Sequence, residues 1–375
     1  MDFGFVFSIL KRGNEMIEIK KEPIETSRIN IKVVGVGNAG GNIISRIYGK
    51  IDGVQFVIFN TDANALKDAK GDIKIQIGEK TTQGRGSGKD PEKGKFAANE
   101  DKEKIAEVLK NTQIVFLIAG LGGGTGTGGT PVIAKIAKDL GALIISLVTT
   151  PFEFEGEKRM GNAKIGLENL EKSVDTLIHI SNQKLYEIVD DKISLLEAFG
   201  KVDEIISRTI SSISDLIYKP KLFDIDFADI YSVVENAGRG IVGHGYGSQD
   251  GRMEKAVQSI IDDPLIEKSD IMEAKNVLIS ITGSADLSLK EVGEAIKFIQ
   301  QKITSPSILP GVAIDQNLKD EVKITLLATG IGKSTIERQI PLKSKKTIEL
   351  PLEEKGLNLE DINTPTILRQ KKERV

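Results

Sequence analysis

The sequence contains no cysteine, no tryptophan and only two histidines, and these gaps exclude several classes of chemistry. Without cysteine there is no disulfide framework, no thiolate zinc site and no thiol nucleophile. His179 and His244 are too few for a three-histidine metal site, and no G-x-S-x-G segment is present to support a hydrolytic triad. We therefore expect any metal chemistry to depend on carboxylates and phosphate groups.

The sequence also lacks a large excess of either charge and any long apolar run. It has 51 Lys and Arg against 54 Asp and Glu, a net charge of −3, which argues against a dedicated nucleic-acid binder. No apolar run reaches the roughly 18 residues of a membrane span. The apolar residues 3–10 follow an aspartate rather than a basic segment, so we predict no secretion signal. A soluble globular protein without direct membrane insertion is expected.

The length of 375 residues favours two domains. From residue 30 to 150, short β-rich apolar runs alternate with amphipathic segments, which is typical of an α/β fold with a parallel sheet covered by helices. A long amphipathic helix is predicted over 195–217, ended by Pro220. The predicted strands are Ile31–Val36, Val54–Asn60, Ile73–Ile77, Gln113–Ala119, Leu143–Thr149 and Thr176–Ser181.

A second, smaller α/β domain is predicted after the long helix. The pattern restarts at 239–243, and the expected elements after it are a helix near 254–261, strand 277–282, helix 289–303 and strands around Val312 and Ile324. A polar, lysine-rich linker follows Gly332, and the chain finishes with an apolar and basic peptide. The predicted organisation is an N-terminal extension (1–29), a nucleotide-binding domain with the long helix (30–217), the second domain (218–332), and a linker with the terminal peptide (333–375).

Two glycine-rich segments each follow a predicted strand. In the first, Gly35, Gly37 and Gly40 form a G-x-G-x-x-G pattern, which brings a phosphate close to the backbone at a helix N-terminus. Asp62, at the end of the next strand, lies where a ribose-binding acid of a dinucleotide site would be. An NAD-dependent oxidoreductase of the Rossmann type is therefore one interpretation.

The second segment is a feature that a dinucleotide site does not explain. Seven of the ten residues 120–129 are glycine, and the segment leads into a helix with Thr130 as the expected N-cap and Pro131 in its first turn. Thr125 and Thr127 add hydroxyl donors, so the segment suits two or three phosphates. The glycines expected to permit positive φ are Gly122, Gly123, Gly124, Gly126 and Gly128.

A third glycine-rich segment, 84–88, contains Arg85 and is explained equally well as a phosphate-covering loop or as a surface turn.

Three acids follow the long helix: Asp224, Asp226 and Asp229. If a helix starts here, Asp226 and Asp229 lie on one side, where they could orient a water or hold a cation, or could simply cap the helix. The preceding helix is long enough, at roughly 30 Å, to keep these acids away from the phosphates of their own chain. Catalytic acids would then act on nucleotide held by a neighbouring copy stacked head to tail, an arrangement that generates filaments.

Residues 30–332 resemble the FtsZ family, the bacterial and archaeal tubulin homologues, whose GGGTGTG signature stands at 122–128. The resemblance implies a tubulin-like fold and a GTPase that converts GTP to GDP and phosphate. It further implies polymerisation into protofilaments, an active site completed by the neighbouring subunit, and a role in the division ring. Mg²⁺ is expected to bind mainly through the GTP phosphates, with no protein metal site.

The resemblance also assigns a nucleotide site. The ribose contacts are expected from Glu155 and Arg159, base stacking from Phe199 and base hydrogen bonding from Asp203, because a carboxylate that accepts two N–H groups rejects adenine. Asn182 and Pro151 are expected beside the nucleotide, and Asn60 and Asp62 on its flank. The phosphate-lining residues implied by the family are Gly35, Gly37, Asn38, Ala39, Gly40, Gly41, Asn42, Gly86, Gly120, Gly122, Gly123, Gly124, Thr125, Gly126, Thr127 and Gly128.

The acidic segment resembles the family's catalytic N-x-D-x-x-D loop, so Asp226 and Asp229 are the expected catalytic acids, with Asp224 in place of the asparagine. Asn38 is a second departure, at a position where the family commonly has glycine. Residues 362–375 resemble the family's terminal peptide, which binds membrane-tether division proteins. A cytoplasmic protein at the division site is thus expected, although a related filament for plasmid segregation or cell shape is an alternative.

Overall fold

The computed structural model describes residues 9–12, 15–18, 29–188, 192–218, 221–223, 225–263, 265–266, 273–303 and 307–332. Asp224, Pro220, the expected linker and the terminal peptide 362–375 therefore lie outside the described residues. Of the N-terminal extension, the described part is the backbone of an antiparallel hairpin, β1 (Ile9–Arg12) and β2 (Glu15–Glu18).

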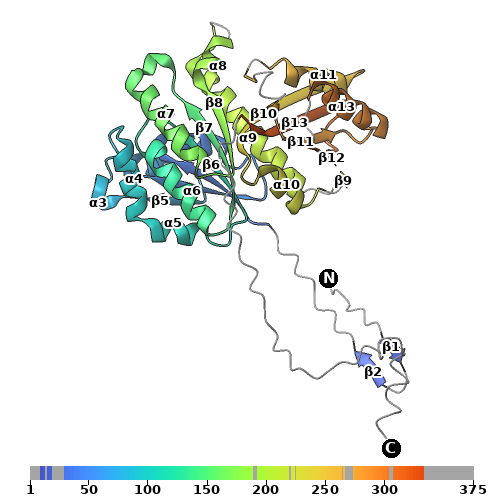
Figure 1. Cartoon of the computed structure of the whole chain (residues 1–375), viewed down its shortest axis with the longest axis horizontal. Coiled ribbons are helices and arrows are strands. Elements are labelled where there is room, and N and C mark those ends of the chain that lie inside the picture. The colour runs from blue at the N-terminus through green and yellow to red at the C-terminus, as the bar shows by residue number, and fades with distance from the viewer. Residues whose placement is uncertain are drawn as a thin grey trace, which may run out of the picture. The chain divides into compact units, whose positions relative to one another are not determined.

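Six parallel strands form the first part of the main sheet, in the order β5-β4-β3-β6-β7-β8 (Figure 1). All six were predicted, each to within one residue at either end. They are β3 (Ile31–Val36), β4 (Val54–Asn60), β5 (Ile73–Gln76), β6 (Ile114–Gly120), β7 (Leu143–Thr150) and β8 (Thr176–Ser181).

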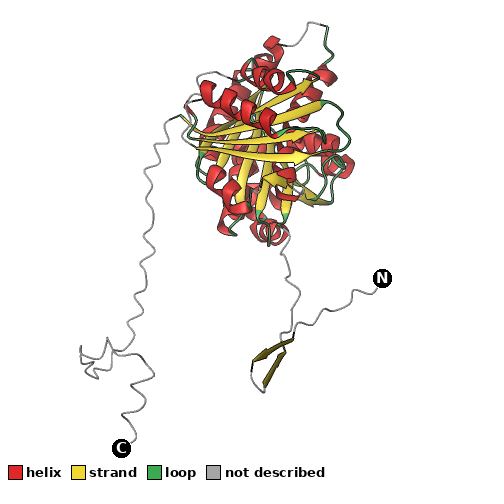
Figure 2. Cartoon of the chain, turned by 90° about the vertical axis from the view of Figure 1, so that its right-hand side faces the viewer, coloured by secondary structure: helices red, strands yellow, loops and turns green. Residues whose placement is uncertain are grey.

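Helices cover both faces of this sheet, as Figure 2 shows. Alternation along each strand divides the core: Phe116 and Ile118 of β6 point to one face, whereas Val115 and Leu117 point to the other. The first face packs against α1 (Gly37–Ile47), α2 (Ala63–Asp68), α8 (Asn182–Ile188), α9 (Leu195–Tyr218) and α10 (Phe227–Val234). The second packs against α4 (Pro91–Glu100), α5 (Lys102–Leu109), α6 (Thr130–Asp139) and α7 (Glu157–Glu171). The short α3 (Glu79–Thr82) precedes α4.

The second part of the sheet has a mixed pattern, with α11 (Arg252–Ile261) and α13 (Leu289–Lys302) packed on it. Its strands are β10 (Gly238–Ser248), β13 (Glu321–Ile331), β11 (Asn276–Gly283), β12 (Ser307–Ile314) and β9 (Lys221–Phe223). The two parts are hydrogen-bonded into one sheet, because residues 238–240 of β10 pair in parallel with residues 176–178 of β8.

Strand β10 extends five residues beyond the segment 239–243 in which the pattern restarts, and its glycines explain why the sequence did not show its full length. A Cβ on Gly245 would lie 2.0 Å from the carbonyl oxygen of Ala256, and one on Gly247 would lie 1.8 Å from that of Arg252. Helix α11 therefore packs its backbone directly onto this strand, a contact that only glycine allows. The glycines needed for packing dilute the β-branched pattern by which a strand is recognised.

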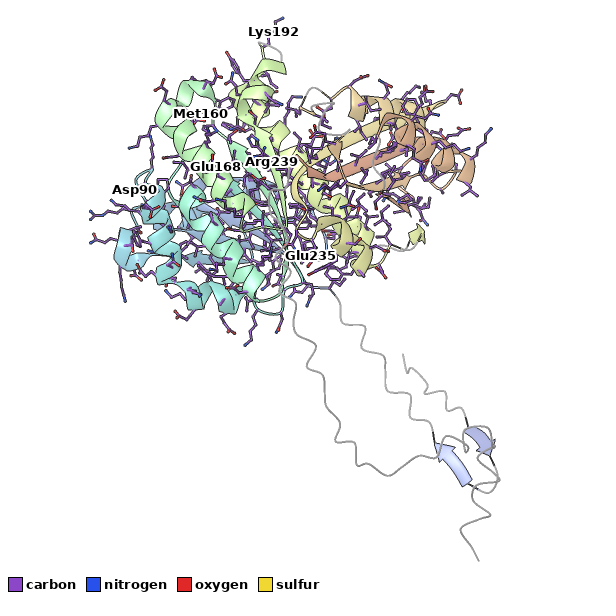
Figure 3. All side chains as sticks on the ribbon, viewed as in Figure 1. Asp90, Met160, Glu168, Lys192, Glu235 and Arg239 are labelled. Carbon is purple, nitrogen blue, oxygen red and sulfur yellow. The ribbon has the colours of Figure 1, made fainter. Side chains whose placement is uncertain are left out.

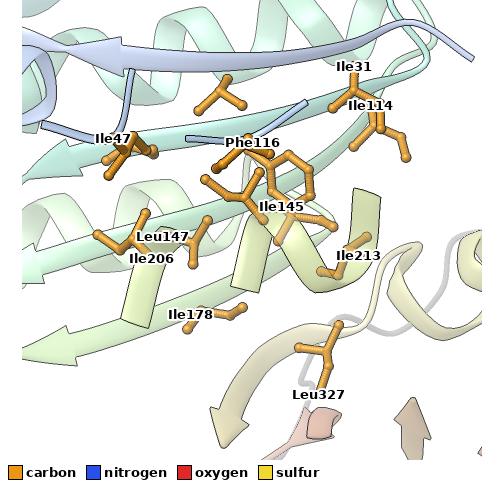
Figure 4. Packing of buried hydrophobic residues seen from close by; sticks show 14 of the residues in the cluster. Ile31, Ile47, Ile114, Phe116, Ile145, Leu147, Ile178, Ile206, Ile213 and Leu327 are labelled. Carbon is orange, nitrogen blue, oxygen red and sulfur yellow. The ribbon is translucent and has the colours of Figure 1, made fainter. Parts of the chain in front are cut away.

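Helix α9 runs through the centre of the molecule, and its 24 residues span about 36 Å at 1.5 Å per residue. Ile206 and Ile213 lie between the parallel sheet and Leu327 of β13 (Figure 4). Lys192, just before α9, and Glu235, just after α10, lie at opposite ends of the molecule (Figure 3). The long helix was predicted to within one residue, and its burial on two sides fixes its position.

His244 of β10 is packed between this helix and β13. Its Nε2 lies 3.2 Å from Oγ1 of Thr209 on α9, and its Nδ1 lies 3.0 Å from Oγ1 of Thr325 on β13. Burial, together with the nearby positive charge of Arg208, lowers the pKa of His244 to about 4. The histidine is therefore neutral in the folded protein at neutral pH.

We expect a pH-dependent loss of stability from this residue. In the unfolded chain a histidine has a pKa near 6.5, so between about pH 6.5 and 4 the unfolded state binds more protons than the folded state and unfolding becomes easier as pH falls. The unfolding free energy of the parent should fall by roughly 2 kcal/mol more than that of His244→Asn between pH 6.5 and 4.5. Urea titrations at each pH measure this; parallel pH profiles would contradict it. His179 is present in both proteins, so its contribution to the pH dependence cancels in the comparison.

The central position of α9 gives a second prediction. Ile210 is fully buried, and Ile210→Ala should lower the unfolding free energy by about 2–5 kcal/mol because it leaves a cavity. Leu196 on the same helix is 74% exposed, so Leu196→Ala should change it by less than about 0.5 kcal/mol. Urea denaturation of both variants makes the comparison; equal effects would show that α9 is not the central packing element.

Candidate functional site

A pocket of about 480 Å³ lies at the carboxyl ends of the parallel strands. It is placed where the strand order reverses, since β3 has β4 on one side and β6 on the other, and ligands of open α/β sheets bind at this position. Its lining comes from α1, the residues after β4, the segment 85–89, the glycine-rich segment, the residues after β7, and the first turns of α8 and α9.

The pocket brings together most of the predicted nucleotide residues. These are Asn38, Ala39, Asn42, Asp62, Gly86, Gly120, Gly123, Gly124, Thr125, Gly126, Pro151, Glu155, Arg159, Asn182, Phe199 and Asp203. It also contains residues that the sequence did not single out for this site: Val36, Ile43, Arg46, Thr61, Lys89, Leu121, Thr149 and Val202. Arg85, Ser87 and Gly88 of the third glycine segment line it as well. The predicted residues that do not line it are Gly35, Gly37, Gly40, Gly41, Asn60, Gly122, Thr127 and Gly128.

The first glycine segment brings α1 against the sheet. A Cβ on Gly40 would lie 2.5 Å from the carbonyl oxygen of Ile118, and one on Gly35 would lie 2.7 Å from that of Gly40. Gly37 has a φ of +71° where the strand turns into the helix, and a Cβ on Gly41 would touch Ile58. These glycines determine how closely the N-terminus of α1 approaches the pocket.

Asn60 is a support for the pocket. Its side chain is buried; Nδ2 donates to Oδ1 of Asn38 at 2.8 Å, and its own Oδ1 accepts from the backbone N–H of Asp62 at 3.1 Å. Asp62 in turn is the N-cap of α2. Asn38, where the family commonly has glycine, is thus held by a hydrogen bond at the edge of the pocket.

The second glycine segment differs from the prediction. Of its glycines from 120 to 129, only Gly122 has a positive φ, of +98°. Residues 125–129 form a π-helical turn, η1 (Thr125–Gly129), that continues into α6, so Thr130 is a helical residue and the predicted N-cap is wrong. The Thr130 hydroxyl instead donates to the carbonyl oxygen of Gly126.

Close packing, not unusual backbone torsion, is the reason for most glycines here. A Cβ on Gly128 would lie 1.8 Å from the carbonyl oxygen of Pro91, and one on Gly124 would lie 2.6 Å from that of Asp90. The first turn of α4 is therefore packed backbone to backbone on the segment. The Thr127 hydroxyl accepts from the Gly122 N–H at 2.9 Å, so its role is to shape the turn.

Three hydroxyl groups connect the segments around the phosphate end of the pocket. The Thr125 Oγ1 lies 2.7 Å from Oγ1 of Thr61 and 3.0 Å from Oγ of Ser87. All three side chains are buried. Ser87 lies in the third glycine segment, whereas Thr61 carries no local sequence signal, because a single hydroxyl is recognised as part of a site only after folding brings it to its partner.

The other end of the pocket contains charged and aromatic groups. Arg159 forms an ion pair with Glu155 one helical turn away, and Phe199 is supported by Phe152 at a ring-centroid distance of 6.0 Å. Asp203 is held by the Arg46 guanidinium.

Two buried polar atoms at this end lack a partner within the described part of the chain: Nε of Arg159 and Oδ1 of Asn182. Buried polar groups are almost always satisfied, so an unsatisfied donor and acceptor in a pocket fit a polar ligand.

The predicted acids lie elsewhere. Asp226 is the N-cap of α10, and it and Asp229 form a reciprocal pair: Asp229 N–H donates to Oδ1 of Asp226 at 2.8 Å, and Asp226 N–H donates to Oδ2 of Asp229 at 3.0 Å. Neither lines the pocket, and Phe199 and Tyr218 of the intervening helix are about 28 Å apart along its axis. Asp226 therefore caps α10, which was one of the two interpretations of these acids, and neither acid reaches the pocket of its own chain.

The described residues hold neither a metal-ligand cluster nor a membrane-spanning helix. No group of three or more His, Asp or Glu there is arranged to hold a metal ion. Among the helices of the described ranges, none is both long and apolar enough to cross a bilayer.

The chain combines three features: a parallel sheet with glycine-lined helix N-termini around one pocket, a long central helix and a second α/β part. Together they define a nucleotide-binding protein of the tubulin-like class. Residues 30–190 match the GTPase domain of the tubulin/FtsZ family, and residues 238–332 match the C-terminal domain of the FtsZ family. The chain therefore belongs to the tubulin/FtsZ family.

Individual relatives agree with this assignment. The chain is 38% identical to the cell division protein FtsZ of Pseudomonas aeruginosa over 90% of its own length and 88% of the relative, and 39% identical to that of Azotobacter vinelandii over 91% and 89%. A structure of an empty FtsZ dimer from M. jannaschii has 40% identity and a TM-score of 0.75, covering 82% of this chain and 89% of that one. CetZ1 from Haloferax volcanii, 21% identical with a TM-score of 0.70 over 81% and 95% of the two chains, shares the fold.

Family membership confirms the predicted fold class and guanine-nucleotide binding by a GTPase domain. It also decides against the oxidoreductase interpretation of the first glycine segment. The G-x-G-x-x-G pattern was correctly placed at a strand-to-helix turn, and the second glycine segment was the feature that distinguished the two classes.

The packing of the second glycine segment leads to a prediction about two neighbouring glycines. Gly128→Ala should lower the unfolding free energy by about 3 kcal/mol or more, because the new methyl group overlaps the backbone of α4. Gly123→Ala meets no atom within 4 Å and should unfold like the parent. Thermal unfolding of both variants compares them. If Gly128→Ala were as stable as Gly123→Ala, the backbone contact with Pro91 would not be a constraint on the segment.

Proposed function

We propose that the chain is a GTP-dependent cell-division filament protein that binds GTP in the pocket described above and hydrolyses it where two copies meet head to tail. The observation that carries this proposal is the separation of the glycine-lined pocket from the Asp226–Asp229 pair by the length of α9. A chain with both halves of a hydrolytic site, too far apart to meet, completes the site by stacking on another copy. The M. jannaschii relative is described as a dimer, which supports self-association.

The chemistry of the pocket orients the nucleotide. The N-termini of α1 and of the η1–α6 segment supply N–H groups and positive helix potential for the phosphates, and Arg85 and Lys89 add positive charge nearby. At the other end, the unsatisfied atoms of Arg159 and Asn182 suit the ribose and its surroundings. Phe199 and Asp203, one helical turn apart on α9, suit a base with two adjacent N–H donors, which guanine has and adenine does not.

The two acids are preorganised for a neighbour's nucleotide. Each uses one carboxylate oxygen in the reciprocal cap, and the other oxygen of each has no partner among the described residues. These free oxygens would orient the water that attacks the γ-phosphate in line, giving GDP and phosphate. Asp224 is proposed as an accessory acid of the same loop.

Mg²⁺ is proposed to bind mainly through the phosphates, since the described residues contain no ligand cluster for it, and would neutralise phosphate charge.

We propose roles for the remaining parts of the chain by analogy with the family. We propose a GTPase domain over 30–217 and an activating domain over 218–332, with residues 1–29 as an extension. Residues 362–375 would bind a membrane-tether division protein through their apolar residues, which places the filament in the cytoplasm at the division site. The match to the C-terminal domain of the FtsZ family favours this role over plasmid segregation or cell shape.

Asparagine caps a helix as well as aspartate does. Asparagine variants of the two acids therefore test catalysis without disturbing the fold. Asp226→Asn and Asp229→Asn should fold and bind GTP like the parent but hydrolyse it about 10²-fold more slowly, because an orienting charge is lost. In the parent, GTP turnover per molecule should rise above a threshold protein concentration. Turnover that is independent of concentration would show a self-contained site and overturn the proposal.

A mixing experiment provides the control. Asp229→Asn retains an intact pocket, and Asp203→Ala, which should not bind GTP, retains intact acids. Their mixture should recover turnover at junctions where the intact pocket meets the intact acids. If neither variant is active alone and the mixture is inactive as well, the shared site is refuted.

A further inference from the structure

Arg46 forms an ion pair with Asp203 inside the pocket. It lies in the last turn of α1, and its guanidinium meets Asp203 of α9 with two hydrogen bonds, from Nε to Oδ2 and from Nη2 to Oδ1, the second at 2.9 Å. The Asp203 side chain is 9% exposed and that of Arg46 is 38% exposed. The geometry is the bidentate fork that an arginine makes with a carboxylate.

A second paired cation among the described pocket residues, Arg159, lies at the same end but bonds Glu155, four residues before it in the chain, whereas Arg46 reaches across from one helix to another. Arg85 and Lys89 form no ion pair among the described residues, which leaves them to the phosphates. Arg46 is therefore the cation that pairs with Asp203, and its charge is already committed to that carboxylate.

A carboxylate has about four acceptor positions on its two oxygens. Arg46 occupies one on each oxygen, which leaves one on each for a ligand and fixes the plane in which they lie. The χ2 torsion of an aspartate has a broad distribution, so an unrestrained carboxylate rotates about it. Such a carboxylate would present these two acceptors to a ligand together for only part of the time. Two adjacent N–H donors, N1–H and the 2-amino group of guanine, need both acceptors at once.

We propose that Arg46 is a positioning residue for base recognition: it holds Asp203 so that the carboxylate accepts from N1–H and the 2-amino group simultaneously. This inference rests on the proposed function, in which Asp203 faces the base. Arg46 does not contact the base in this scheme, and its effect on specificity passes through Asp203. The consequence is selectivity for the 2-amino group itself, beyond the rejection of adenine.

The competing explanation is that the ion pair only joins α1 to α9. The two explanations differ in what they predict for inosine triphosphate, which keeps N1–H but lacks the 2-amino group. A structural clamp supports every nucleotide equally, so its loss lowers all affinities by the same factor. A positioning residue supports the second hydrogen bond, so its loss lowers GTP affinity and leaves inosine triphosphate nearly unchanged.

The test is competition binding of GTP, inosine triphosphate and ATP to the full chain, the parent compared with Arg46→Ala and Arg46→Lys. The parent should bind GTP about tenfold more tightly than inosine triphosphate, the value of one hydrogen bond to a charged group. Arg46→Ala should lower GTP affinity about tenfold and inosine triphosphate affinity less than about threefold, so the preference disappears. Arg46→Lys should restore part of it, since an ammonium supplies charge without the fork.

Arg208→Ala is the matched control. Arg208 pairs with Glu204 on the surface of α9, the helix that carries Asp203. Both side chains are 54% exposed, and Arg208 does not line the pocket. This variant should match the parent for all three nucleotides, and thermal unfolding of every variant shows whether it is folded.

Equal losses for GTP and inosine triphosphate in folded Arg46→Ala, or in Arg46→Lys if the alanine variant does not fold, would overturn the inference in favour of a clamp. An unchanged preference would overturn it as well. In both cases the parent still prefers GTP to ATP, so the proposed function stands. A parent that does not prefer GTP to ATP would refute the proposed function together with this inference.

Discussion

Helix α9 is held on two sides at once, by the parallel sheet and by β13 with β11, through isoleucines that are almost completely buried. It can neither shift along its axis nor bend without exposing one of these faces, and each buried side chain contributes on the order of 1.5–3 kcal/mol. Its first turns supply Phe199 and Asp203 to the pocket, and the chain after its end supplies Asp226 and Asp229. The distance between pocket and acids is therefore a consequence of core packing.

The pocket itself depends on close backbone contacts. Gly40 contacts Ile118 and Gly128 contacts Pro91, so α1 approaches β6 and α4 approaches the η1 segment at distances that no side chain would permit. These contacts bring helix N-termini and the Thr61–Thr125–Ser87 hydroxyls to one end of the pocket, where positive potential and donors collect. The carboxylate and the aromatic ring lie at the other end, so the pocket has a polarity that matches a nucleotide lying along it.

Much of this arrangement was predictable. The parallel strands were predicted because they are buried on both faces and are therefore continuously apolar, and the long helix because its apolar stripe repeats over six turns. The length of strand β10 was not apparent because its glycines, which let α11 pack closely on it, interrupt the β-branched pattern. Thr130 was misassigned because a Thr-Pro pair resembles a helix start even where a π-helical turn already precedes it. Arg46 was not predicted because an arginine in the last turn of a helix is ordinary by local criteria.

The sequence by itself determined the class of the protein: strand-to-helix turns rich in glycine, an intact signature at 122–128, and two acids beyond a long amphipathic helix are local patterns that do not depend on where they lie in space. Only the tertiary structure decided which glycines face the pocket and which pack against backbone, which hydroxyls meet, and that Arg46 reaches Asp203 from another helix. Those facts depend on contacts between residues far apart in the chain, and such contacts leave no periodicity or spacing in a single sequence.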